Sequence, residues 1–401
     1  MKYIVILGDG MADYPLGELG GKTPLQAAQK PNFDFMAQKG EVGLVKTIPD
    51  GQKPGSDNAN LSVLGYDPTI YYSGRSPLEA VSIGIALGED DVTYRCNLVT
   101  ISQAERYEDA VMVDYSSDEI STVEADELIR FLAGRFSELG VELYTGISYR
   151  HCMVLRDAET GTVLTPPHDI SDKQVGAYLP KDGNAQLLTY LMKESHKLLR
   201  DHPVNQKRIR QGKRPANSAW FWGEGRKPAL SPFYEKYGKK GVVISAVDLI
   251  KGIAICAGMK SIDVPGATGN IDTNFEGKAQ AALDALAAGA DFVYVHIEAP
   301  DECGHRHEVQ NKVRAIELID EKIAGPILEE MNKRQEEFAI MVLPDHPTPL
   351  SLRTHVAEPV PFLIYRSAVK QGSGQPYDEA SAKSTGLFID KGHELLGYFF
   401  K

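Results

Sequence analysis

Three strongly apolar runs in this chain each lead to an acidic residue, and this repeated pattern limits the fold more than any other feature. The runs cover residues 3–7, 292–297 and 338–343, and the acids that follow them are Asp9, Asp301 and Asp345. Short apolar runs rich in β-branched residues and bounded by Gly or Pro are typical of buried strands in a parallel sheet. Because ligand sites of open α/β sheets lie beyond the carboxyl ends of the strands, we expect three carboxylates at one sheet edge. A divalent cation is the usual counter-charge for such a group.

The length of the chain and a change of pattern along it predict two domains. A chain of 401 residues is too long for a typical single core. Residues 76–262 contain none of the acidic strand ends, and their predicted strands (91–100, 149–155) alternate with predicted helices (124–139, 185–201). We therefore expect an α/β domain, with a mostly parallel sheet flanked by helices, that is split into residues 1–75 and 263–401. A smaller α+β domain is expected as an insertion at 76–262.

The composition argues against several classes of partner. The net charge is −12 and no basic tract is long enough to hold a nucleic-acid backbone. No apolar stretch approaches the roughly 20 residues that cross a bilayer, and Met1 leads directly into the first predicted strand without room for a signal peptide. The four cysteines are scattered without a CxxC pair, which is typical of free thiols in a reducing cytosol. We expect a cytoplasmic protein with no nucleic-acid or membrane partner.

Histidine and serine residues near the acidic strand ends complete a set of metal ligands. The set consists of Asp9, Ser56, Asp301, His305, Asp345, His346 and His355. Mixed Asp and His ligation suits Mn²⁺ or Zn²⁺, whereas Mg²⁺ prefers surroundings made only of oxygen. Seven groups exceed what one cation needs, so we predict two divalent cations. Two cations roughly 4 Å apart hold both the attacking and the leaving oxygen of a phosphoryl displacement.

Ser56 is the candidate nucleophile of this set. It follows a Gly- and Pro-rich stretch at residues 49–55, and a helix that begins near Ser56 would turn its backbone N–H groups toward an anion. A nearby metal lowers the pKa of a serine hydroxyl and so activates it. Structural roles remain open for single members of the set: Ser56 as a helix cap, Asp9 as a turn residue, and the histidines as loop residues.

Longer blocks of sequence carry a resemblance to a known family. They include Gly8-Asp9-Gly10-Met11-Ala12-Asp13, Pro54-Gly55-Ser56-Asp57, Gly74-Arg75-Ser76-Pro77-Leu78-Glu79-Ala80, Glu298-Ala299-Pro300-Asp301 and Pro344-Asp345-His346. Almost from end to end, the chain resembles the archaeal-type cofactor-independent (2,3-bisphosphoglycerate-independent) phosphoglycerate mutases of the alkaline phosphatase superfamily. The resemblance implies an alkaline phosphatase-like core and a phosphoserine mechanism in which Ser56 carries the phosphoryl group between 2- and 3-phosphoglycerate.

The resemblance also implies which residues hold each metal and the substrate. Asp9, Ser56, Asp345 and His346 would hold one cation, and Asp301, His305 and His355 the other, with Mn²⁺ preferred over Zn²⁺, Co²⁺ or Mg²⁺. The inserted domain would close over a small phosphorylated or carboxylate-bearing substrate. Candidate contacts for its anionic groups are Arg95, Arg150, His151, His168 and Lys278. Arginine suits phosphate and carboxylate because its fork donates two hydrogen bonds at once.

One segment departs from the family pattern. Archaeal mutases carry an Asp-Arg-Arg-Ala-Gly-Arg element where this chain has Val113-Asp114-Tyr115-Ser116-Ser117-Asp118-Glu119-Ile120, and Asn60 stands where they usually have His. The Asp-Tyr pattern resembles a bacterial branch that has been proposed to phosphorylate homoserine, whose ammonium group could meet Asp114, Asp118 or Glu119. A homoserine kinase-like phosphotransferase of threonine biosynthesis is therefore one alternative, although the chain has no Walker-type loop. A phosphatase and a non-catalytic metal-binding protein are the others.

Overall fold

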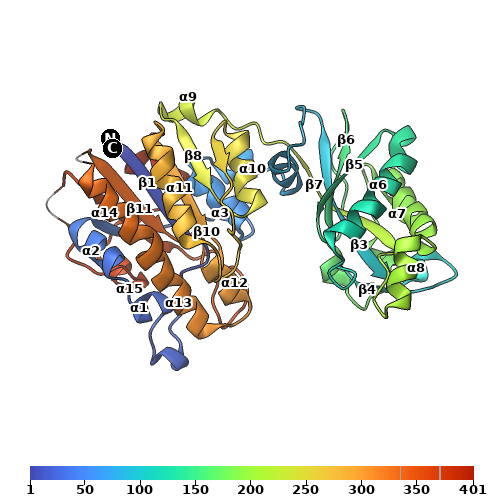
Figure 1. Cartoon of the computed structure of the whole chain (residues 1–401), viewed down its shortest axis with the longest axis horizontal. Coiled ribbons are helices and arrows are strands. Elements are labelled where there is room, and N and C mark those ends of the chain that lie inside the picture. Colours follow the sequence, from blue (N-terminus) through green and yellow to red (C-terminus); the bar gives the residue numbers. More distant parts are fainter. Residues whose placement is uncertain (335, 370–371) are drawn as a thin grey trace. The chain divides into compact units, whose positions relative to one another are not determined.

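The computed structural model of the protein describes residues 1–334, 336–369 and 372–401. These residues form two compact units, which are residues 1–72 with 229–401 (the large unit) and residues 73–228 (the small unit). Figure 1 shows the elements of each unit. No helix among the described residues is both long enough and apolar enough to span a membrane.

A mostly parallel sheet is the centre of the large unit. Within the described residues it has eight strands in the order β13-β2-β12-β11-β1-β10-β8-β9. In chain order the strands are β1 (Lys2–Gly8), β2 (Glu41–Val45), β8 (Gly241–Ile244), β9 (Lys260–Ile262), β10 (Phe292–Ile297), β11 (Phe338–Leu343), β12 (Val360–Arg366) and β13 (Phe388–Ile389). β12 pairs in an antiparallel way with both of its neighbours, and the other pairs are parallel. The predicted fold class is therefore confirmed.

Helices cover both faces of this sheet. They are α1 (Pro24–Ala27), α2 (Pro31–Lys39), α3 (Ser56–Val63), α4 (Pro68–Tyr71), α9 (Phe233–Tyr237), α10 (Asp248–Cys256), α11 (Phe275–Ala287), α12 (Ala299–His305), α13 (Val309–Ile319), α14 (Gly325–Lys333), α15 (Glu379–Ser384) and α16 (Leu395–Phe399). Val293 and Val295 of β10 belong to the core that α11, α13 and α14 cover. Because side chains alternate along a strand, Tyr294 and His296 face the opposite side, where Tyr294 bonds to Asn60 of α3.

The boundary between the units differs from the expected one. Residues 229–262 were assigned to the insertion, but they belong to the large unit. β8 pairs with β10 from residue 241 to residue 244, and β9 extends the same sheet beyond β8. The sequence hid this return because both strands are short, at four and three residues, and neither leads into an acidic ligand. The insertion therefore ends near residue 228 rather than 262.

Two predictions about helix ends have different outcomes. Thr23 caps α1 as expected, and its hydroxyl accepts the backbone N–H of Gln26 while the Gln26 side chain accepts the backbone N–H of Thr23. The helix expected at 309–333 is not one regular α-helix, because a π-helical turn (Asp320–Ala324) separates α13 from α14. The buried Asp320 carboxylate within this turn accepts the backbone N–H groups of Asn32 and Phe33 at the start of α2.

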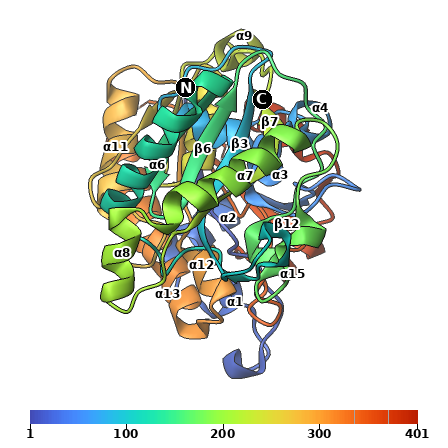
Figure 2. The same ribbon diagram turned by 90° about the vertical axis from the view of Figure 1, so that its right-hand side faces the viewer.

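The small unit is an α+β layer structure. In the described residues its antiparallel strands are β3 (Val92–Ile101), β4 (Met112–Asp114), β5 (Val141–Ile147), β6 (Arg150–Leu155) and β7 (Ser218–Arg226). Its helices are α5 (Ser76–Ser82), α6 (Thr122–Phe136), α7 (Ala185–Arg200) and α8 (Pro203–Arg210). α6 and α7 lie across one face of the sheet (Figure 2), and their leucines pack on Tyr94, Cys96 and Leu98 of β3.

Glu379, at the start of α15, is a buried carboxylate of the large unit that titrates near neutral pH. It accepts the Thr23 hydroxyl at 2.7 Å and the backbone N–H of Asp13 at 3.2 Å. Burial is the main reason that its pKa rises from 4.5 to about 7. The folded pKa lies above the unfolded value, so folding takes up a proton between these two pH values. The stability that Glu379 contributes below pH 4.5 is therefore lost as the pH rises through 7.

We expect Glu379→Gln to remove this pH dependence, because the amide does not ionise. Between pH 5 and pH 8 the difference in unfolding free energy between the variant and the parent should change by about 2 kcal/mol in favour of the variant. Urea unfolding of both proteins at several pH values measures this difference. A constant difference over the range would contradict a neutral-range titration of Glu379.

Candidate active site

The candidate site forms where three neighbouring strands of the large sheet end. β1 lies between β10 and β11, with Gly8 paired to Ile297 and Leu7 paired to Leu343. The chain segments that follow therefore leave the sheet at the same edge, where Asp9, Asp345 and the first turn of α12 with Asp301 come together. This is the convergence that the apolar runs predicted.

A first group of ligands surrounds Asp9. Oxygens of Asp9 and Asp345 and the Nε2 atom of His346 all lie within 4.8 Å of one another. Ser56, the first residue of α3, places its Oγ 3.2 Å from His346 Nε2 and 3.4 Å from Asp9 Oδ2. Asp345 Oδ1 is fixed by the backbone N–H groups of Gly10 and His346, at 3.1 and 2.8 Å. The buried carboxylates and the hydroxyl therefore point into one small volume.

A second group surrounds Asp301. Its Oδ2 lies 3.2 Å from His305 Nε2, and its Oδ1 lies 3.5 Å from His355 Nε2. The two imidazole Nε2 atoms are only 2.9 Å apart. His305 is fixed from behind, because its Nδ1 lies 3.0 Å from the carbonyl of Arg353. If that Nδ1 carries the proton, Nε2 has a free lone pair, as a metal ligand requires. Donor atoms of Asp301, His346 and His355 also lie within 4.8 Å of one another, so the two groups adjoin.

The donor set fits divalent cations. The Asp9 carboxylate is almost fully buried, and its Oδ1 has no hydrogen-bond partner among the described residues. Burial raises the pKa of Asp9 well above its usual range, and the charges of Asp345 and Asp301 raise it further. A buried, unpaired carboxylate oxygen beside two more carboxylates and several ring nitrogens is costly unless a cation binds there. The residues present therefore suit the metals that the donor types predicted.

Two residues that sequence reasoning missed support the ligands. His296 contacts Asp9 Oδ2 through Nε2 at 3.1 Å and the Ser245 hydroxyl through Nδ1 at 3.2 Å. The Thr348 hydroxyl donates to Asp301 Oδ1 and lies 3.3 Å from His346 Nδ1, so it links the two groups. The alternation of β10 is the signal that could have found His296, because a histidine in an otherwise apolar buried strand needs polar partners.

Asn60 joins a further supporting chain. Its Nδ2 donates to Asp345 Oδ2 at 2.9 Å and to the Ser56 carbonyl at 2.8 Å, and its Oδ1 accepts the hydroxyl of Tyr294. All three side chains in this chain (Tyr294, Asn60 and Asp345) are fully buried. The residue that departs from the family pattern thus holds a candidate metal ligand in place.

Tyr294→Phe should weaken metal binding by about tenfold, because the Asn60 amide loses the partner that fixes its orientation toward Asp345. Calorimetric titration with Mn²⁺ measures the change. Tyr377→Phe is the matched control, since Tyr377 is equally buried and donates to the Pro361 carbonyl away from the site. Equal Mn²⁺ affinity in the two variants would contradict a supporting role for Tyr294.

Three of the expected substrate contacts gather on one face of the small unit. Arg95 of β3 lies opposite Trp222 in the register of β3 and β7, and its guanidinium is 4.2 Å from the Trp222 ring centroid. The ring of His168 packs against Trp222 at 5.3 Å. Arg150 begins β6 opposite Asn97 and is exposed. Arg95 is already paired with Glu79, whose Oε2 lies 2.9 Å from its Nε.

The other two candidates lie elsewhere. His151 faces the opposite side of β6 from Arg150, because side chains alternate, and it is buried with its Nδ1 accepting the Gly146 N–H. Burial lowers its pKa to about 3. The structure therefore does not bring His151 to the arginine face. Lys278 belongs to α11 of the large unit, where it is buried and donates to the carbonyl of His296 at 2.9 Å.

Comparisons with known proteins identify the family. Residues 37–205 match the model of the 2,3-bisphosphoglycerate-independent phosphoglycerate mutases. The protein of that name from Methanosarcina barkeri is 51% identical over 100% of both chains. A probable 2,3-bisphosphoglycerate-independent phosphoglycerate mutase from Geobacter sulfurreducens is 50% identical over 99% of this chain and 98% of its own.

Two solved structures share the fold of the chain. The PH0037 protein of Pyrococcus horikoshii has a TM-score of 0.83 and 30% identity, over 99% of this chain and 96% of its own. The cofactor-independent phosphoglycerate mutase of Thermoplasma acidophilum has a TM-score of 0.69 and 27% identity, over 100% of this chain and 99% of its own. The chain belongs to the 2,3-bisphosphoglycerate-independent phosphoglycerate mutase family.

Proposed function

We propose that the protein interconverts 2-phosphoglycerate and 3-phosphoglycerate, with Ser56 as the carrier of the phosphoryl group. The observation that carries this proposal is the position of the Ser56 Oγ, within 3.4 Å of both Asp9 and His346 in the candidate ligand set. The mutase names of the full-length relatives support the same reaction. We also propose a cytoplasmic location, which suits the free cysteines Cys96, Cys152, Cys256 and Cys303.

The reaction needs two transfers. The Ser56 Oγ attacks the phosphorus of the substrate, its proton leaves to a base, and the bond from phosphorus to the substrate oxygen breaks to release glycerate. The other glycerate hydroxyl then attacks the phosphoserine, gives up its proton, and the serine hydroxyl forms again. Two divalent cations, preferably Mn²⁺, would lower the pKa of the hydroxyl groups and neutralise the charge of the phosphoryl oxygens. We propose Asp9, Ser56, Asp345 and His346 as one ligand group and Asp301, His305 and His355 as the other.

The chain's own residues prepare the serine for this role. Ser56 is the first residue of α3, so unbonded backbone N–H groups of the first helical turn lie beside its side chain. Partial positive charge at a helix start favours a phosphoryl group there. Asn60, one turn later, accommodates the Ser56 carbonyl and fixes Asp345 at the same time. These contacts reduce the freedom of the nucleophile before substrate arrives.

For the carboxylate and phosphate of the substrate we propose Arg95, Arg150 and His168 of the small unit and Lys278 of the large unit. The acidic residues of the small unit do not favour an ammonium-bearing substrate instead. Asp114 accepts an N–H of the Arg214 guanidinium at 3.1 Å, and Asp118 accepts the backbone N–H of Arg214 at 2.7 Å. Their charge is thus already balanced, and neither the relatives nor the geometry supports the homoserine kinase or phosphatase alternative.

An enolase-coupled assay with 3-phosphoglycerate tests the proposal. We expect turnover without added 2,3-bisphosphoglycerate, loss of turnover after metal chelation, and recovery with Mn²⁺. A parallel reaction with ATP and homoserine should give no homoserine phosphate. Formation of homoserine phosphate without mutase turnover would contradict the proposed reaction, and steady release of phosphate from 3-phosphoglycerate would indicate a phosphatase.

A further inference from the structure

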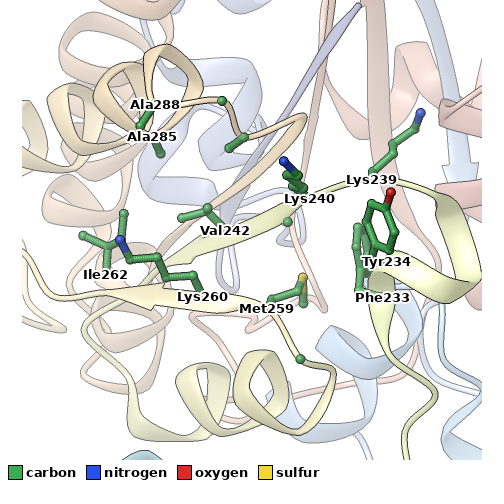
Figure 3. A pocket seen from close by; sticks show the side chains of 14 residues that line it. Phe233, Tyr234, Lys239, Lys240, Val242, Met259, Lys260, Ile262, Ala285 and Ala288 are labelled. Carbon is green, nitrogen blue, oxygen red and sulfur yellow. The ribbon is translucent and has the colours of Figure 1, made fainter.

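A cavity of about 500 Å³ opens in the large unit away from the candidate active site. It is lined by the start of β8, by residues 258–262 with β9, by α9, and by the end of α11 (Figure 3). Gly241 begins β8 and Ala290 precedes β10, so the cavity lies at the amino ends of these strands. The candidate metal ligands follow the carboxyl ends. Six residues of β10 separate the two ends by about 20 Å at the usual rise of a strand.

Small residues create the hollow. Six lining residues lack any side chain beyond a methyl group, namely Gly241, Gly258, Ala285, Ala288, Gly289 and Ala290. A Cβ atom at Gly241 would lie 2.7 Å from the Met259 sulfur, so this wall cannot gain a side chain without movement. Phe233, Val242, Met259 and Ile262 supply the apolar surface of the cavity. The hollow is thus apolar inside and has the volume of a small-molecule site.

The rim of the cavity is positively charged. Lys239, Lys240 and Lys260 line it, and no acidic residue does, although the whole chain has a net charge of −12. Lys239 is engaged elsewhere, because its ammonium lies 4.5 Å from the ring of Tyr3 and 5.0 Å from that of Phe400. Figure 3 shows Lys239 extending away from Val242, whereas Lys240 and Lys260 stay beside it.

Lys240 and Lys260 are both exposed and neither has an ion pair within the described parts of the chain. The nearest acid in sequence to this wall is Asp291, whose carboxylate is held by the backbone N–H of Lys240 at 2.9 Å. Two lysine charges without ion-pair partners therefore lie beside an apolar hollow. That combination suits a ligand with one anionic end and an apolar body.

We propose that this cavity binds a small organic carboxylate with an aromatic or short aliphatic body. The carboxylate pairs with Lys240 and Lys260, and the body packs on Phe233, Val242, Met259 and Ile262. The site is separate from phosphoryl transfer, and the proposal does not rest on the proposed function.

Binding of 4-phenylbutyrate to the full-length protein tests the site, measured by displacement of anilinonaphthalene sulfonate fluorescence and by calorimetry. Lys240→Glu/Lys260→Glu should weaken binding by at least about tenfold, because attraction becomes repulsion. Lys39→Glu/Lys391→Glu is the matched control, with the same change of net charge at exposed lysines outside the cavity. Ala288→Trp, at an exposed position, should fill the hollow and abolish binding.

Three results would overturn the proposal. They are no saturable binding of 4-phenylbutyrate at millimolar concentration, equal binding of the uncharged 4-phenylbutanol, and equal affinity of the two lysine double variants. Mutase turnover, measured on the same preparations, should be unchanged in Lys240→Glu/Lys260→Glu and shows that this variant is folded.

Discussion

Ser56→Ala should lower phosphoglycerate mutase turnover by at least about ten-thousandfold, because the nucleophile of both proposed transfers is lost. The change removes one oxygen at the first residue of α3, where the Ser56 Oγ contacts Asp9 and His346. Six of the seven candidate ligands stay in place, so the variant should still bind Mn²⁺. The measurement is the enolase-coupled rate, with calorimetric Mn²⁺ titration beside it.

Ser62 provides the matched control. It lies on the same helix and is buried, and its hydroxyl has no hydrogen-bond partner among the described residues. Ser62→Ala removes the same atom from α3 and should leave turnover unchanged. Comparable rates for Ser56→Ala and the parent protein would disprove the phosphoserine mechanism, whatever the metal content.

Lys312→Met should reduce the free energy of unfolding by about 3–5 kcal/mol, because it leaves the Asp13 carboxylate buried without its partner. Both side chains are fully buried, and the Lys312 ammonium lies 2.7 Å from Asp13 Oδ2. The same ammonium donates to the carbonyl of Thr348 at 2.8 Å. Turnover should fall as well, since Thr348 holds Asp301 through its hydroxyl.

An exposed ion pair isolates the effect of burial. Lys333 pairs with Glu329 at the same 2.7 Å, with both side chains more than half exposed. Lys333→Met should cost less than about 1 kcal/mol, because solvent screens that pair. Urea unfolding of the two variants gives the comparison. The expectation for Lys312 would be wrong if both changes had the same small cost. Lys312→Met/Asp13→Asn should recover part of the loss, because no buried charge is left unpaired.

The parts of the fold that were predictable from the sequence are those with a local signal. Each acidic strand end lies next to the apolar run that forms its strand, so the edge where Asp9 and Asp345 meet followed from neighbouring residues. The helix beginning at Ser56 and the cap at Thr23 also follow from adjacent residues. The family resemblance brought His355, which is distant in sequence, into the expected ligand set.

The parts that were missed depend on tertiary structure. His296 and Thr348 contact ligands through the pleat of β10 and the path of the loop after β11, and neither lies in a recognisable motif. His151 was assigned beside Arg150, but one step along a strand reverses the direction of the side chain. The return to the large sheet at residue 241 was missed because a strand of four residues is too short to show a pattern.

The most direct test of the two-cation site is anomalous diffraction at the manganese edge, from crystals of the protein grown with Mn²⁺. We predict two peaks, one between Asp9, Ser56, Asp345 and His346, and one between Asp301, His305 and His355. Active enzyme whose manganese lies elsewhere, or that contains none, would contradict the assignment of these residues as the metal ligands.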